Sequence, residues 1–209
     1  MSAREGAKER LARLLEHDAN YLAPGLIMGG MDEAGRGPLA GPVVAACAVM
    51  PAGEPILGVN DSKKLSAAAR ERLFAQIQAQ ALFLGIGMAS VDEIEALNIR
   101  AASRLAMERA ADGAKADFLL VDYEEGLSLQ LPHIGIAHGD ALSYQIACAS
   151  IAAKVTRDLL MIKLDEKHPG YGLAAHKGYG TAAHCEAILR LGPSPAHRAS
   201  FLRKLPGGK

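Results

Sequence analysis

The stretch LIMGGMDEAGRGPLAGP, residues 26–42, decides how the rest of the chain is interpreted. It places two carboxylates, Asp32 and Glu33, side by side among apolar and small residues, with Arg36 as its only cation. If residues 27–33 form a strand, the two acids point to opposite faces, so they cannot both be ordinary surface residues of a half-buried sheet. A carboxylate in an apolar setting needs a cation or a metal as its partner, and glycines let the backbone come close to a ligand. The stretch therefore predicts a divalent-metal site next to a polyanion.

Length and composition are those of an ordinary globular chain. The 209 residues suit one domain, or one domain with a small appendage. The formal net charge is zero, so any contact with nucleic acid has to depend on local cations. The three cysteines, Cys47, Cys148 and Cys185, lack C-x-x-C spacing and are expected to be reduced, which favours the cytoplasm. Residues 1–20 lack a signal-peptide pattern and no apolar run reaches the ~18 residues of a membrane span. We expect no contact with a membrane and, since nothing suggests an obligate dimer, a monomer.

Hydrophobic periodicity and turn residues predict an α/β architecture. The apolar runs at 26–31 and 43–50, joined by the glycine-rich turn, predict an antiparallel pair of strands. Further strands are predicted at residues 81–90, 117–122 and 133–137. Helices are predicted at residues 3–17, 67–80, 91–111, 141–167 and 182–191, and a loop at 169–180. Two glycines in the third strand indicate that another segment approaches closely there. The order of elements predicts a mixed sheet with helices packed on it.

Four carboxylates stand at the ends of predicted strands or at a strand–helix junction: Asp32, Glu33, Asp122 and Asp140. A strand end gives a functional group rigid support and still lets it reach solvent. Four clustered carboxylates would repel one another, and two divalent cations are the simplest compensation. Two such ions ~4 Å apart activate water and stabilise the leaving oxygen of a phosphodiester. The alternative is that each acid is a solvated charge at the end of a strand.

Cations near these acids are the next group of candidates, and each alone is typical of a solvated face. They are Arg36, Lys63-Lys64, Lys154, Arg157, His176-Lys177 and His197-Arg198. Flanking glycines favour Arg36 and Lys177 as contacts for phosphate or sugar oxygens. Tyr179 is either a stacking platform for a sugar or base or a partly buried aromatic residue. His138 and His184 lack a partner at metal-ligand spacing, so neither is interpreted as a zinc ligand.

Several motifs, met in order along the chain, resemble bacterial ribonuclease HII, the type 2 ribonuclease H. They are MDEAGRGPLAGPVV, NDSKKLS, FLLVD, HGD at 138–140, ASIAAKVTRD at 149–158, HKGYGT at 176–181 and HRASF at 197–201. The resemblance extends from about Ile27 to Phe201. It implies a ribonuclease H-like fold, a mixed five-stranded sheet flanked by helices with a small helical C-terminal part. We expect an N-terminal helical extension (1–25), a catalytic domain (26–168) and a C-terminal substrate-binding part (169–209).

The resemblance also implies an activity. Members of the family cleave RNA in RNA–DNA hybrids, including single ribonucleotides embedded in duplex DNA. The family's catalytic acids correspond to Asp32, Glu33, Asp122 and Asp140, which would hold Mg²⁺ or Mn²⁺, with two ions during catalysis. The element that reads the 2′-hydroxyl corresponds to Gly35, Arg36 and Gly37, and the tyrosine that stacks on the following sugar to Tyr179. Lys63 and Lys154 correspond to lysines near the phosphates. We expect water to attack the phosphorus 5′ to a ribonucleotide, leaving a 3′-hydroxyl and a 5′-phosphate.

The chain departs from the family pattern at two places near the expected metal site. Tyr123, followed by Glu124-Glu125, stands where bacterial members commonly have a small residue, and His138 replaces the lysine of a K-G-D motif. These changes would affect metal preference or pH dependence without removing a ligand.

Two rival functions stay open. One is another nuclease or recombinase of the same fold, acting on DNA junctions or double-stranded RNA. The other is a non-catalytic hybrid-binding module or a phosphate-loop nucleotide binder. The chain contains no G-x-x-x-x-G-K-[ST] string for such a loop, and four acids would repel a polyanion without metal.

Overall fold

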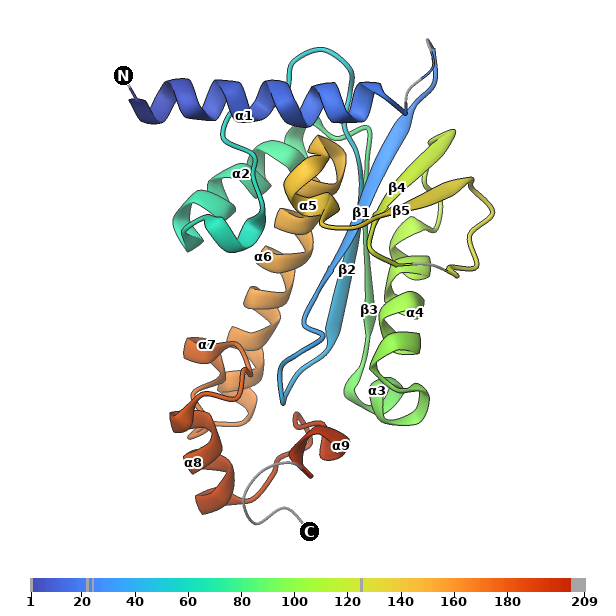
Figure 1. The fold of residues 1–209 in the computed structure, drawn as a ribbon. Helices are drawn as coiled ribbons and strands as arrows, with labels where there is room; N and C mark the ends of the chain where they lie inside the picture. The colour runs from blue at the N-terminus through green and yellow to red at the C-terminus, as the bar shows by residue number, and fades with distance from the viewer. Residues whose placement is uncertain (1, 22, 24, 125, 204–209) are drawn as a thin grey trace.

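A computed structural model describes residues 2–21, 23, 25–124 and 126–203, and its centre is a five-stranded mixed sheet (Figure 1). The strands are β1 (Met28–Ala34), β2 (Val43–Val49), β3 (Phe83–Ala89), β4 (Phe118–Asp122) and β5 (His133–Ile136). They lie in the order β3-β2-β1-β4-β5. β2 pairs antiparallel with β1 and β3, whereas β4 pairs parallel with β1 and β5. The C-terminal ends of β1, β4 and β5 therefore meet at one edge of the sheet.

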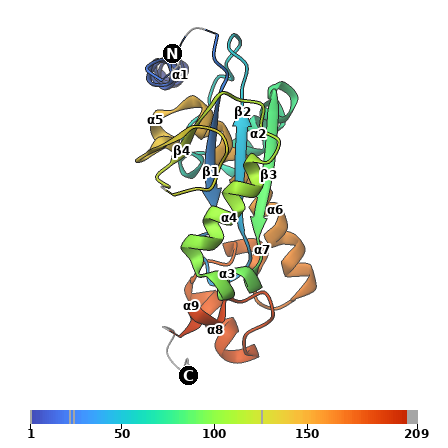
Figure 2. The same ribbon diagram turned by 90° about the vertical axis from the view of Figure 1, so that its right-hand side faces the viewer.

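Helices cover both faces of this sheet. The long helix α6 (Tyr144–Lys167) packs on β1 and β2 from one side, and α4 (Ile99–Ala111) packs on β2 and β3 from the other. Figure 2 shows α4 in front of the sheet, with α6 behind it. The remaining helices are α1 (Ser2–Ala19), η1 (Ser62–Lys64), α2 (Ala67–Gln80), α3 (Val91–Leu97), α5 (Gly139–Leu142), α7 (Leu173–His176), α8 (Ala182–Leu191) and α9 (Ala199–Leu202). This arrangement confirms the predicted α/β architecture with helices on a mixed five-stranded sheet.

Small residues let these two helices come close to the sheet. Every residue of β2 is buried, and its side chains alternate between the core cluster under α6 and the cluster under α4. A Cβ atom added to Gly30 in β1 would overlap the backbone of α6 at Gln145. Added to Gly85 or Gly87 in β3, it would overlap carbonyl oxygens of α4. The predicted close approach at the two β3 glycines is therefore confirmed, and the approaching segment is α4.

Two predicted long helices are wrong because each is broken by a capping residue. The helix predicted over 91–111 divides at Asn98, which has φ 72° and accepts hydrogen bonds from the amides of Arg100 (3.0 Å) and Ala101 (3.2 Å). With ψ at 164°, Asn98 leaves the helical conformation, and its side chain caps the following helix. The helix predicted over 141–167 begins earlier, as α5, and divides at the extended residue Ser143, whose side chain caps α6.

The C-terminal part contains more helix than predicted. The loop expected at 169–180 includes α7, and α9 lies in the tail. Thr181 caps α8, as predicted, by accepting a hydrogen bond from the His184 amide. Residues 204–209 of the basic tail lie outside the described residues. Cys47, Cys148 and Cys185 are free thiols, and none of the described helices is long and apolar enough to cross a membrane.

Candidate metal centre and the loops beside it

Three of the four predicted acids meet at the edge where the parallel strands end. Asp32 lies in β1, Asp122 is the last residue of β4, and Asp140 lies in α5, which follows β5. One carboxylate oxygen from each lies within 4.8 Å of the others. Oxygen ligands at this spacing suit a hard divalent cation such as Mg²⁺ or Mn²⁺. The structure therefore brings Asp32, Asp122 and Asp140 together, and Glu33 lies outside this group.

The pKa values of Asp32 and Asp122 fit a site for a bound cation. Asp32 is only 5% exposed. Its pKa is raised well above the usual range, first by burial and then by the charges of Glu33 and Asp122. The pKa of Asp122 is also raised, by burial and by the charge of Asp140. A divalent cation between these groups would stabilise their ionised forms, because an opposite charge favours a carboxylate that burial and like charges disfavour.

Hydrogen bonds fix how these carboxylates point. Asp32 Oδ1 accepts from the Glu33 amide at 2.7 Å. Asp122 Oδ1 accepts from the Gly139 amide at 2.7 Å, which ties β4 to the start of α5. Asp140 Oδ2 accepts from Lys63 Nζ at 3.0 Å. The predicted lysine at 63 therefore contacts one of the clustered acids directly.

Glu33 lies on the other side of β1, against the loop that follows it. Its Oε1 accepts from Arg36 Nη1 at 3.2 Å, and its Oε2 is buried without a hydrogen-bond partner among the described residues. The pKa of Glu33 is raised, chiefly by burial, although the charge of Arg36 lowers it. A buried carboxylate oxygen without a partner is costly. Glu33 Oε2 can therefore bind a cation or accept a hydrogen bond from a ligand.

The two departures from the family pattern lie at the surface. Tyr123 is 71% exposed with φ 49°, and His138 is exposed with φ 58°.

Glu124, by contrast, is 3% exposed, and its Oε1 lies 2.7 Å from Arg104 Nε. Its Oε2 lies 3.8 Å from Arg36 Nη1. Sequence reasoning missed this buried acid, which helps to hold Arg36; Glu125 lies outside the described residues.

The loop that contains Gly35, Arg36 and Gly37 (the G-R-G loop) lies beside the loop that contains Tyr179 (the Tyr179 loop). A Cβ atom on Gly37 would be 3.9 Å from Tyr179 Cε1. The Leu39 amide donates to the Gly178 carbonyl oxygen at 2.8 Å, which joins the two loops through their backbones. Tyr179 is 45% exposed, so its ring is available to a ligand. The structure thus places Gly37 of the G-R-G loop beside Tyr179.

Two buried arginines hold these loops, and sequence reasoning treated both as solvated. Arg157 of α6 donates through Nη2 and Nε to the carbonyl oxygens of Ala40 (3.1 Å) and Pro42 (3.0 Å). Arg157 Nη1 donates to the Lys177 carbonyl oxygen at 3.0 Å. The other arginine, Arg198, donates to the carbonyl oxygens of Gly35 (2.7 Å), Arg36 (3.0 Å) and Gly41 (2.7 Å).

These guanidinium groups have only backbone carbonyls as hydrogen-bond partners in the described part of the chain. Burial, together with the charge of Arg157, lowers the pKa of Arg198 to about 9. Backbone carbonyl oxygens of both loops accept hydrogen bonds from these buried guanidinium groups, which fix the position of the loops. No local pattern could have revealed this, since the partners of Arg198 lie more than 150 residues away in the sequence.

A cluster of three histidines, His176, His184 and His197, supports the backbone at Tyr179. His184 Nδ1 lies 2.9 Å from the Tyr179 carbonyl oxygen, so that nitrogen carries a proton, and His184 Nε2 then accepts from His197 Nε2 at 3.1 Å. His176 Nδ1 accepts from the Gly178 amide at 3.2 Å. Burial and the neighbouring His184 lower the pKa of His197 to about 4. The hydrogen bonds of these rings therefore set the path of the backbone that carries Tyr179.

The other two lysines predicted to contact phosphate, Lys154 and Lys177, have partners outside the acid cluster. Lys154 forms an ion pair with Asp158 on the same helix, and Asp158 also lies 3.6 Å from Arg70. Lys177 donates to the Ala174 carbonyl oxygen. Among the lysines of the described chain, Lys63 is the one whose ammonium group pairs with the clustered acids.

If the chain cleaves a duplex containing one ribonucleotide, as the resemblance implies, replacing Arg198 with lysine should lower kcat/KM for it by on the order of 10- to 100-fold. Lysine keeps the positive charge, but its ammonium group lacks the planar set of N–H donors with which the Arg198 guanidinium bonds to three carbonyl oxygens. Steady-state kinetics would measure the loss, with the exposed Arg190→Lys as the matched control. Any metal-induced rise in unfolding temperature should persist, because the acids are untouched. Wild-type kinetics in Arg198→Lys would show that these hydrogen bonds do not position the loop.

Comparisons with known proteins find a family model, relatives and a solved structure to which this chain is similar. Residues 29–204 match the family model described as Ribonuclease HII. The Ribonuclease HII of Syntrophotalea carbinolica is 55% identical over 174 residues, which cover 82% of this chain and 83% of that protein. The Ribonuclease HII of Moorella thermoacetica is 49% identical over 204 residues, which cover 96% and 99% of the two chains. The crystal structure of the ribonuclease H2 from Pyrococcus horikoshii OT3 matches with a TM-score of 0.71 at 26% identity, covering 85% of this chain and 96% of that one.

Proposed function

The chain belongs to the ribonuclease HII family, and we propose that it hydrolyses the RNA strand of RNA–DNA hybrids and incises duplex DNA 5′ to single embedded ribonucleotides. The observation that carries this proposal is the cluster of Asp32, Asp122 and Asp140, with one oxygen of each within 4.8 Å of the others. Asp32 of the cluster lies near the end of β1, and the G-R-G loop follows β1 directly in the chain.

The four acids Asp32, Glu33, Asp122 and Asp140 would hold Mg²⁺ or Mn²⁺, with two ions during catalysis. When bound, such ions activate a water for attack on phosphorus and stabilise the leaving oxygen. The chain itself supplies orientation: the Gly139 amide holds Asp122, and Lys63 holds Asp140. The Lys63 ammonium group also reduces repulsion between the acids and a phosphate. The products would carry a 3′-hydroxyl and a 5′-phosphate.

Selection of the ribonucleotide would depend on the 2′-hydroxyl, the group that distinguishes RNA from DNA. Backbone groups at Gly35, Arg36 and Gly37 would contact it, and the Tyr179 ring would stack on the following sugar. The two buried arginines support this assignment, because they leave the loop little freedom to move away from Tyr179. Lys154 would lie near the phosphates.

The remaining parts of the proposal concern the whole molecule. Residues 1–25 would form an N-terminal extension, 26–168 the catalytic domain and 169–209 a C-terminal substrate-binding part. The enzyme would act as a monomer in the cytoplasm. Its partner would be nucleic acid that contains ribonucleotides.

A panel of substrates tests the proposed activity. DNA with one ribonucleotide and a long RNA–DNA hybrid should both be cut, whereas an all-DNA duplex, double-stranded RNA and a DNA junction should stay intact. Cutting of junctions or double-stranded RNA in place of the first two would make the protein another nuclease of this fold. Tight hybrid binding without cutting, in either metal, would make it a binding module.

A further inference from the structure

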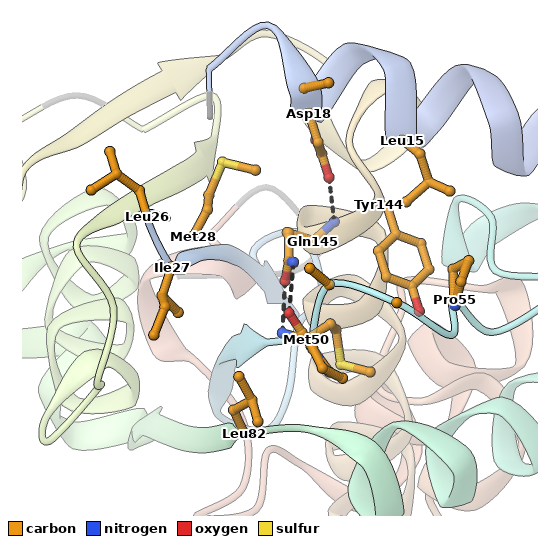
Figure 3. A pocket seen from close by; sticks show the side chains of 14 residues that line it. Leu15, Asp18, Leu26, Ile27, Met28, Met50, Pro55, Leu82, Tyr144 and Gln145 are labelled. Atoms are coloured by element: carbon orange, nitrogen blue, oxygen red, sulfur yellow. Dashed lines mark hydrogen bonds between the residues drawn. The ribbon is translucent and has the colours of Figure 1, made fainter. Parts of the chain in front are cut away.

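Helix α1 lies outside the segment that matches the family model, yet it is anchored firmly to the catalytic part. Leu11 and Leu14 are buried in the core cluster that α6 shares with β2. Asp18 Oδ2 accepts from the Gln145 amide at 3.1 Å, in the first turn of α6 (Figure 3). A carboxylate at a helix N-terminus is favourable. The orientation of α1 relative to the metal centre is therefore fixed, even though a cavity of about 320 Å³ remains beside Asp18.

The opposite flank of α1 forms one wall of a groove of about 450 Å³. Arg10 and Arg13 line this wall, one helical turn apart. The other wall consists of Lys64 from η1 and of Ala141 and Leu142 from α5. The groove is therefore open between the N-terminal helix and two segments of the catalytic domain.

Those two segments also build the metal centre. Lys64 follows Lys63, whose Nζ lies 3.0 Å from Asp140 Oδ2, and Ala141 follows Asp140 in α5. The G-R-G loop extends from the far end of β1, and α5 lies between that loop and α1 (Figure 1). A strand whose scissile phosphate lay at the acids and whose junction lay at Tyr179 would therefore continue toward α1.

The groove is locally basic in a chain with no net charge. Arg10 and Arg13 have no ion-pair partner among the described residues. The Lys64 side chain is 62% exposed, and its Nζ lies 3.7 Å from Asp61 Oδ2. Glu16 is the one carboxylate residue that lines the groove among the residues described. Side chains one turn apart are separated by about 4.5 Å along a helix, while each DNA strand carries one phosphate per about 3.4 Å of helix axis. Two arginines at this spacing can reach neighbouring phosphates.

We propose that this groove binds the sugar–phosphate backbone of the substrate duplex beyond the cleavage site. The proposal rests on the proposed function and adds a contact surface on α1, a helix that the family model does not include. The contact is to phosphates and therefore independent of sequence. It gives a chain of zero net charge a local hold on its substrate next to the metal centre.

The test compares the double variant Arg10→Gln/Arg13→Gln with Lys8→Gln. Lys8 is exposed on the same helix but points about 140–160° away from the two arginines. The dissociation constant for a duplex with one ribonucleotide would be measured with chelator present, over a range of salt concentrations. In the double variant we expect the slope of log K against log salt to become shallower by about 1.8, because two phosphate contacts are lost. Lys8→Gln should match the wild type both in the salt slope and in kcat in the presence of metal.

A gain-of-binding variant covers the case in which the double variant folds poorly. Glu16→Gln removes the carboxylate of the groove and should tighten binding two- to threefold, most clearly at low salt. The inference fails if the double variant keeps the wild-type slope, if Lys8→Gln loses as much, or if Glu16→Gln binds no more tightly. The groove would then suit an acidic protein segment instead. These outcomes are independent of the proposed function, which is tested separately by whether the wild type cuts the same duplex.

Discussion

Asp140→Asn should reduce cleavage of a ribonucleotide-containing duplex by a factor of at least about 1,000, because a metal site supplies several kcal/mol of transition-state stabilisation. Asparagine has nearly the same shape but lacks the charge that a divalent cation needs. It also removes one of the like charges that act on Asp32 and Asp122. In chelator, the variant should therefore unfold at the same temperature as the wild type or at a higher one.

Single-turnover cleavage and thermal unfolding, each with and without Mn²⁺, would measure these effects. Asp112→Asn, at an exposed helix end, serves as the matched control and should behave as the wild type. Mn²⁺ should raise the unfolding temperature of the wild type and the control but not of Asp140→Asn. An active Asp140→Asn enzyme would remove this residue from the proposed ligand set.

Gly30→Ala should destabilise the fold by about 3 kcal/mol or more, among the largest effects that a single methyl group can have. Its Cβ would overlap the backbone of α6 at Gln145 and Ile146, and neither helix nor strand can move without disturbing the core. Because Asp32 is two residues further along β1, activity should fall together with stability. Urea unfolding followed by circular dichroism would give the change in the free energy of unfolding.

Gly6→Ala is the matched control for this prediction. Gly6 lies in α1 with open space around its Cβ position, so alanine there should stabilise the protein by up to about 1 kcal/mol through helix propensity. If Gly30→Ala were as stable as Gly6→Ala, the close packing of β1 on α6 would be wrong.

The elements with regular patterns could be predicted from the sequence. The buried strand FLLVD and the paired runs around the glycine-rich turn have the lengths and compositions of strands, and all five predicted strands are present. Asp32, Asp122 and Asp140 could be found because each stands at a strand end or just after one. Parallel pairing of β4 with β1 and β5 then brings them to one edge. Their proximity depends on the sheet order, which the sequence pattern alone does not contain.

The features that could not be predicted depend on long-range contacts or on single capping residues. Arg157 and Arg198 look like surface cations in sequence, and only the fold brings backbone carbonyls of residues 35–42 to them. Glu124, in the loop after β4, is buried for the same reason, since Arg100 and Arg104 come from α4. Asn98 interrupts a continuous helical pattern because its own side chain caps the next helix. Hydrophobic periodicity does not report such interruptions.

We expect the clustered acids to form a divalent-metal centre that cuts 5′ to a ribonucleotide. The most direct measurement uses an end-labelled DNA duplex with one ribonucleotide, incubated with Mg²⁺, with Mn²⁺ or with chelator. A metal centre at these acids should give a single cut on the 5′ side of the ribonucleotide, with a 3′-hydroxyl and a 5′-phosphate, in metal but not in chelator. Cleavage that persists in chelator, or a cut on the 3′ side, would contradict it.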